Sequence, residues 1–92
     1  MSNVQTTNTI DMQDLIKEWE KDCSDFLKGK VVKKVRYMTK SEADATGWFS
    51  RPLIIEFSDG TYVMPMADDE GNDGGAMYTS DKELSVIPVM RD

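Results

Sequence analysis

The fold is decided by the stretch Leu53-Ile54-Ile55-Glu56-Phe57-Ser58-Asp59-Gly60-Thr61-Tyr62-Val63-Met64-Pro65-Met66. Apolar and polar residues alternate on both sides of Asp59-Gly60, a pair that favours a two-residue type I′ turn. With that turn, Phe57 faces Tyr62, and apolar residues meet across the hairpin. Pro65 has no N–H to donate, so we expect the hydrogen-bond ladder to break there. The sequence therefore predicts a short β-hairpin.

An acidic, glycine-rich loop follows the hairpin directly. It runs Ala67-Asp68-Asp69-Glu70-Gly71-Asn72-Asp73-Gly74-Gly75-Ala76, with four carboxylates and three glycines. Glycine allows positive φ and close approach of the backbone to another group. Carboxylates so close together disfavour one another's charge unless a cation or a hydrogen-bond donor compensates. We therefore expect a functional site, if the chain has one, in this loop.

Three interpretations of the loop stay open. Its asparagine and glycines can serve only to fix turns. Its acids, with Asn72, can dock a protein partner. Alternatively, Asp68, Asp69, Glu70 and Asp73 can hold calcium or magnesium, because these cations prefer oxygen ligands. The spacing departs from an EF-hand, since counting from Asp69 places Gly71 where the third position needs an acid.

Two adjacent aromatic residues precede the hairpin, in Gly47-Trp48-Phe49-Ser50-Arg51-Pro52. On an extended chain Trp48 and Phe49 point to opposite faces, so at least one ring can be exposed. An exposed aromatic ring beside Arg51 has the composition of a hot spot in a protein interface. In the alternative, one ring closes the core and the other lies against a loop.

A long amphipathic helix is expected over residues 11–28. Asp11 can cap its first turn, and Gly29 suits the left-handed position after its end. The apolar residues recur at three- and four-residue intervals on one face: Met12, Leu15, Ile16, Trp19, Cys23, Phe26 and Leu27. Because Cys23 belongs to this stripe and the chain has no histidine to activate it, we interpret it as a small packing residue.

The remaining pattern predicts a strand over 30–38, a short helix over 39–47 and two short strands over 76–79 and 84–90. Thr39 and Glu42 match a capping box. The fold class is therefore α+β, with one long N-terminal helix packed on a small, mainly antiparallel sheet of four to five strands. The strand lengths also permit an SH3-like half-barrel. We expect residues 1–8 to be a disordered tail and residues 9–92 to be a single domain.

Composition excludes several classes of function. Of the 92 residues 39% are hydrophobic and 30% charged, and the formal net charge is −6, which disfavours direct binding of nucleic acid. The basic run Lys28-Gly29-Lys30-Val31-Val32-Lys33-Lys34-Val35-Arg36 is best explained as a strand edge protected by lysine. No apolar run approaches the roughly 18 residues that span a membrane. A single cysteine excludes an intramolecular disulfide, so a cytoplasmic protein is expected, and homo-oligomerisation is a plausible supplement to so small a core.

Arrangements typical of enzymes are missing from the sequence. The chain has no histidine, no phosphate-cradling glycine motif and no set of zinc ligands. We therefore expect a non-enzymatic protein without a resident cofactor, calcium being the one candidate.

The segments that follow form a distinctive motif: Gly47-Trp48, Arg51-Pro52-Leu53, Asp59-Gly60, Pro65, Asp68-Asp69-Glu70-Gly71-Asn72, Gly75-Ala76-Met77-Tyr78 and Ile87-Pro88-Val89. In these the chain resembles a family of small uncharacterised proteins of bacteria and phages. There a similar hairpin precedes a D-x-E-G-N-x-x-G-A loop, and an I/L-P-V segment lies near the end. The resemblance covers about half the chain, from Gly47 to Met90, without the N-terminal helix. It implies a recurring loop design and no mechanism.

The sequence thus favours a small binding or accessory module that contacts a protein partner. Its expected contact residues are Trp48, Arg51, Asp68, Asp69, Glu70, Asn72 and Asp73. The first alternative is a domain that binds calcium through the four acids of the loop. The second is an acidic inhibitor that imitates nucleic acid, for which the helix offers Asp14, Glu18, Asp22 and Asp25 but dilutes them with lysines.

Overall fold

The structure, a computed structural model, describes residues 11–91. The chain forms two compact units, and the boundary between them lies between Lys30 and Val31. The tail that we expect to be disordered, residues 1–8, lies outside the described residues. That residues 9–92 form a single domain stays a prediction.

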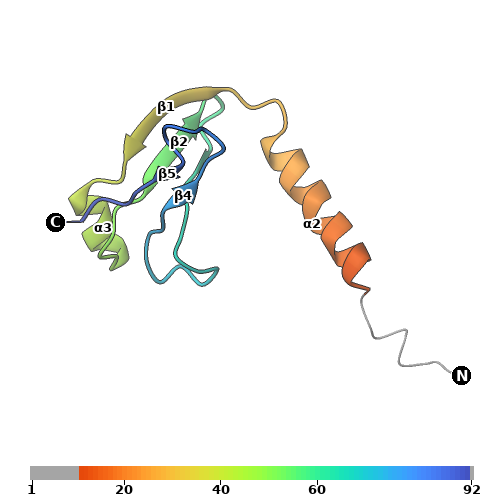
Figure 1. The fold of residues 1–92 in the computed structure, drawn as a ribbon, viewed down its shortest axis with the longest axis horizontal. Coiled ribbons are helices and arrows are strands. Elements are labelled where there is room, and N and C mark those ends of the chain that lie inside the picture. The colour runs from red at the N-terminus through yellow and green to blue at the C-terminus, as the bar shows by residue number, and fades with distance from the viewer. Residues whose placement is uncertain (1–10, 92) are drawn as a thin grey trace, which may run out of the picture. The chain divides into compact units, whose positions relative to one another are not determined.

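The first unit contains the expected long helix, α2 (Met12–Leu27) (Figure 1). Asp11 is its N-cap and accepts the backbone N–H of Gln13 at 3.1 Å. Gly29 follows the helix with a φ of 79°, a left-handed conformation that glycine adopts without strain. Taken by itself, α2 buries none of its residues, and Cys23 is an exposed free thiol. Within residues 11–91, no helix has the length and apolarity needed to cross a membrane.

The second unit contains five short antiparallel strands in two sheets (Figure 1). The first sheet has the order β1 (Val32–Tyr37), β2 (Leu53–Phe57), β3 (Tyr62–Val63). The second pairs β4 (Met77–Tyr78) with β5 (Val86–Ile87). The α+β class is confirmed, whereas the expectation of one sheet of four to five strands is wrong. β3 stops before Pro65, as predicted, and the chain then leaves the first sheet and enters the acidic loop. The strands of residues 11–91 form no closed barrel.

The hairpin between β2 and β3 has a different register from the predicted one. Glu56 pairs with Tyr62, and the N–H of Phe57 donates to the carbonyl of Thr61 at 2.8 Å. The connection is therefore a three-residue loop, Ser58–Gly60, and Gly60 has a φ of 92°. A left-handed glycine at the end of such a loop is a common alternative to the two-residue turn. The predicted two-residue type I′ turn is therefore wrong, because the loop is one residue longer.

This shift decides which side chains reach the core. A change of one residue in register moves every side chain of a strand to the opposite face. As a result, Met64 shares a face with Ile54 instead of Ile55. Ile54 is buried together with Met38 and Ala43, and Met64 and Trp48 pack against this cluster.

The short helix α3 (Lys40–Thr46) joins β1 to β2 (Figure 1). Thr39 and Glu42 form the predicted capping box, since the hydroxyl of Thr39 accepts the Glu42 N–H and Glu42 accepts the Thr39 N–H. Gly47 ends the helix with a φ of 80°. Ala43 anchors α3 to the core, and the segment with Trp48 and Phe49 follows directly.

Candidate functional site

The acidic loop is closed at its base by backbone pairing. Met66 and Gly74 form an antiparallel bridge. Next to it, the Ala67 N–H donates to the carbonyl of Asp73 at 3.0 Å, and the Gly75 N–H donates to that of Pro65 at 3.0 Å. The loop is therefore a folded projection with paired ends, as in compact surface loops of other proteins.

Asp68 organises the tip of this loop. Its carboxylate accepts the Glu70 N–H at 2.9 Å and the side-chain amide of Asn72 at 2.8 Å. Gly71, between Glu70 and Asn72 in the chain, has a φ of 75°. The hydrogen bond from the Asn72 side chain, followed by that from the Glu70 backbone, lowers the pKa of Asp68. This Asx-type turn explains the Asp, Asn and Gly of the motif by local structure.

Asp73 ties the loop to the segment before β2. Its carboxylate accepts the N–H groups of Ser50 at 2.8 Å and Phe49 at 3.1 Å, and also the hydroxyl of Ser50 at 3.2 Å. The N–H of Gly74 donates to the same carboxylate at 2.8 Å. These donors, the Ser50 backbone first, lower the pKa of Asp73. Since Ser50 is only 1% exposed, the loop is held at a buried point of the unit.

Trp48 makes a second connection. Its indole Nε1–H donates to the carbonyl of Gly71 at 2.8 Å, while its ring packs against the core of Met38, Ala43 and Ile54. Phe49, the next residue, is 87% exposed. The structure combines the two predicted arrangements: Trp48 helps to close the core, as in the second, but the other ring is exposed, as in the first, and does not lie against a loop. The exposed aromatic ring is that of Phe49.

Two glycines allow the loop to lie this close to its neighbours. A Cβ atom on Gly74 would stand 2.5 Å from Cδ of Pro52 and 2.9 Å from the carbonyl oxygen of Ser50. A Cβ atom on Gly75 would stand 2.6 Å from the carbonyl oxygen of Met66. Real Cβ atoms do not approach so closely, so both positions require glycine because of contact and not because of φ.

A shallow pocket of about 140 Å³ opens beside Phe49. Its walls come from α3 and from the segment that follows: Lys40, Ala43, Asp44, Trp48, Phe49 and Arg51. Lys40 and Asp44 form an exposed ion pair at 3.7 Å. Arg51 is half-buried, its Nη1 donates to the carbonyl of Met38 at 3.4 Å, and its backbone pairs with Met90. The exposed ring thus stands at the edge of a polar hollow.

The structure brings together some of the predicted site residues. Trp48, Asp68, Asn72 and Asp73 each take part in a hydrogen bond within the loop or between the loop and the segment before β2, and Arg51 lines the pocket beside Phe49. Asp69 and Glu70 are exposed at the loop tip. Within residues 11–91, no three acidic, cysteine or histidine side chains are grouped as metal ligands would be. Sequence reasoning missed Phe49 as the exposed ring, because alternation alone does not say which of two neighbours faces the core.

Comparisons with protein-family models, with curated proteins and with solved structures give no match to this chain.

Proposed function

We propose that this chain is a cytoplasmic, non-enzymatic binding module that docks a protein partner through the acidic loop and the ring beside it. The observation that supports this most is the exposure of Phe49, 87%, next to a loop that Asp73 and Trp48 hold in place. An aromatic ring on a preorganised surface binds with little loss of conformational freedom. Aromatic residues also dominate the energetics of protein interfaces.

The charges of the loop indicate the chemistry of the partner. Two of the four carboxylates, Asp68 and Asp73, are occupied by hydrogen bonds within the unit. Asp69 and Glu70 are exposed at the tip and give it a negative potential, and Glu70 also accepts the side-chain amide of Asn72 at 3.4 Å. A complementary partner has an apolar pocket for Phe49 and basic side chains around it. Such charges mainly steer association and fix orientation, so binding should weaken as salt increases.

Capture from the source cell with matched variants tests this proposal. Phe49→Ala removes the ring, and Tyr78→Ala removes an equally exposed ring, 81%, on β4. A charge variant, Asp69→Asn with Glu70→Gln, removes two of the negative charges at the tip. We expect a partner that the wild type and Tyr78→Ala retain, and that the other two variants lose with an unchanged melting temperature. Equal recovery with all variants would refute the proposal.

The packing of α2 belongs to the same proposal. That α2 covers an apolar sheet face, that the strands form an SH3-like half-barrel and that the chain forms a homo-oligomer are proposals that rest on the sequence pattern, above all on the apolar stripe of the helix. Trp19 lies in the stripe. In a Trp48→Phe variant its fluorescence reports alone, and strong acrylamide quenching at all protein concentrations would contradict this packing.

A further inference from the structure

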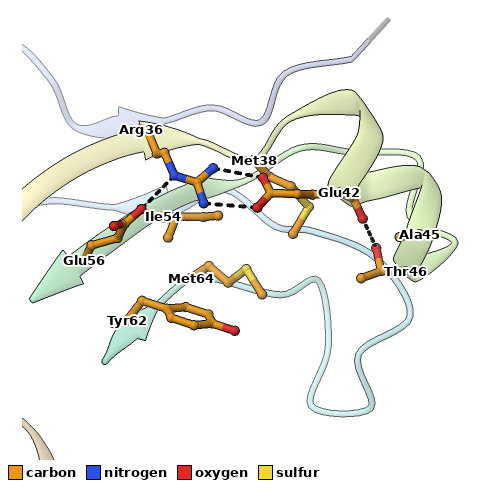
Figure 2. A pocket seen from close by; sticks show the side chains of 9 residues that line it. All are labelled: Arg36, Met38, Glu42, Ala45, Thr46, Ile54, Glu56, Tyr62 and Met64. Carbon is orange, nitrogen blue, oxygen red and sulfur yellow. Dashed lines mark hydrogen bonds and ion pairs between the residues drawn. The ribbon is translucent and has the colours of Figure 1, made fainter. Parts of the chain in front are cut away.

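A second pocket, of about 340 Å³, lies between α3 and the first sheet (Figure 2). Its apolar surface includes Met38 and Ile54, which are 3% and 4% exposed, and the neighbouring Met64. Tyr62 of β3 lies opposite Arg36 across the hollow (Figure 2). This volume is at the lower end of the range for small-ligand sites.

One wall of the pocket is a network of three charged side chains. Arg36 donates from Nη1 and Nη2 to the two oxygens of Glu42, at 2.9 and 3.1 Å. Its Nε donates to Oε2 of Glu56 at 2.7 Å, and Nη1 also reaches the carbonyl of Tyr37 at 3.3 Å. Figure 2 shows the guanidinium held between the two carboxylates. Two carboxylates therefore face the single positive charge of Arg36, and these three side chains together carry a net charge of −1.

This excess selects the charge of a ligand. An anion would have to compete with two carboxylates for a guanidinium that already has a bidentate partner. A cation, by contrast, is attracted by the net negative charge of this wall. Within residues 11–91, Oε1 of Glu56 accepts no hydrogen bond, and the Glu56 side chain is 32% exposed. The aromatic ring of Tyr62 is a further group that attracts organic cations, and the flexible side chains of the two methionines suit an alkyl chain.

We propose that this pocket binds a primary alkylammonium group, with the ammonium at Glu56 and the alkyl chain along Ile54 and Met64. Two sources can supply this chemistry: a free aliphatic amine, or a lysine side chain of a basic segment in another protein. None of the residues that line this pocket belongs to the acidic loop.

Methionine methyl resonances give a direct test with the full-length protein. Met38 and Met64 line the pocket, whereas Met12, Met77 and Met90 do not and serve as internal controls. The probes are n-hexylamine, n-hexanol and hexanoate at neutral pH, which share a chain and differ in charge. We expect the amine to shift Met38 and Met64 selectively, with a millimolar Kd as suits so small a ligand. It should bind about fivefold tighter than the alcohol, the effect of a partly exposed ion pair.

Two further arms separate the sources and the mechanism. Nα-acetyl-lysine methylamide tests the lysine source; its binding supports a side-chain ligand, and its failure beside a binding hexylamine supports a free amine. Glu56→Gln keeps the shape of the site and should abolish the preference for amine over alcohol, whereas Glu83→Gln, in the exposed turn before β5, should preserve it. Equal shifts with amine and alcohol in the wild type would overturn the proposal, as would shifts that spread to all methionines.

Discussion

The carboxylate of Asp73 lies 2.8 Å from the backbone nitrogen of Ser50 and joins two segments separated by 23 positions. Through it, the glycine-rich loop and the turn before β2 form one surface. Because Ser50 is buried while Phe49 is exposed, the same contact that fixes the loop also fixes the backbone beneath the exposed ring. The surface proposed for docking is therefore preorganised by a residue that points inward.

Replacement of Asp73 by asparagine should loosen this surface. The amide keeps one acceptor, but it loses the charge and turns a donor toward the Ser50 hydroxyl, which lies 3.2 Å from the second carboxylate oxygen. We expect a lower melting temperature and faster hydrogen exchange at the amides of Phe49 and Ser50. Asp69→Asn, at the exposed tip, is the matched control and should change neither. Unaltered exchange at both amides would show that Asp73 does not hold the loop.

Trp48 should behave as a structural residue. Trp48→Phe keeps most of the ring packing and loses the hydrogen bond from Nε1 to Gly71, which contributes about 1 kcal/mol to the free energy of unfolding. Trp48→Ala also creates a cavity beside Met38 and Ile54, and should cost about 2–3 kcal/mol, below the range for a fully buried ring. Chemical denaturation measures both. If Trp48→Ala unfolds at the wild-type midpoint, the indole is a free contact residue, as the sequence first suggested.

The sequence predicted best where local chemistry decides the structure. Asp11, Thr39 with Glu42, and Gly47 are capping residues whose partners lie within four positions, so α2 and α3 begin and end as expected. Pro65 ends β3 for an equally local reason.

Non-local competition accounts for what the sequence missed. Asp59-Gly60 is compatible with a two-residue or a three-residue turn, and packing of Met64 on the core favours the second. The pairing of Arg36 with Glu42 and Glu56 unites side chains six and twenty positions apart. No periodicity indicates such a contact. In the same way, only the tertiary structure decides that Trp48 faces inward and Phe49 outward.

Gly74 and Gly47 should respond differently to substitution. Gly74→Ala places a methyl group against Pro52 and the Ser50 carbonyl, and an overpacked contact of this kind costs about 1–3 kcal/mol. Gly47 has open space around it and a φ of 80°, so Gly47→Asn, which tolerates the left-handed region, should cost less. Thermal unfolding of the two variants compares them directly. A larger loss for Gly47→Asn would mean that the loop can move away from Pro52.

Calcium should leave the melting temperature unchanged. Asp68 and Asp73 direct their oxygens at N–H donors, and a cation would have to replace these hydrogen bonds while lying beside positive N–H dipoles. A ligand that binds the folded state raises the melting temperature by linkage. Scans with millimolar calcium, with magnesium as the comparison, measure this. A rise with calcium that Asp68→Asn abolishes would restore the calcium-binding interpretation of the loop.

The Arg36 network should make stability sensitive to acid. Hydrogen bonds from Arg36 and then from the Thr39 backbone hold the pKa of Glu42 at about 2, below its ordinary value of 4.5. A carboxyl whose pKa is lower in the folded state stabilises that state fully above the ordinary value, and loses this contribution as protons bind between 4.5 and 2. The pKa values of Asp68 and Asp73 are also lowered in the folded state, so these carboxylates change stability with pH in the same direction.

Glu42→Gln should therefore lower the melting temperature at neutral pH, and the difference from the wild type should shrink as the pH falls toward 2. Glu83→Gln, outside the network, should follow the wild-type curve throughout. Equal melting temperatures of Glu42→Gln and the wild type at every pH would show that Glu42 acts through its shape in the capping box and not through its charge.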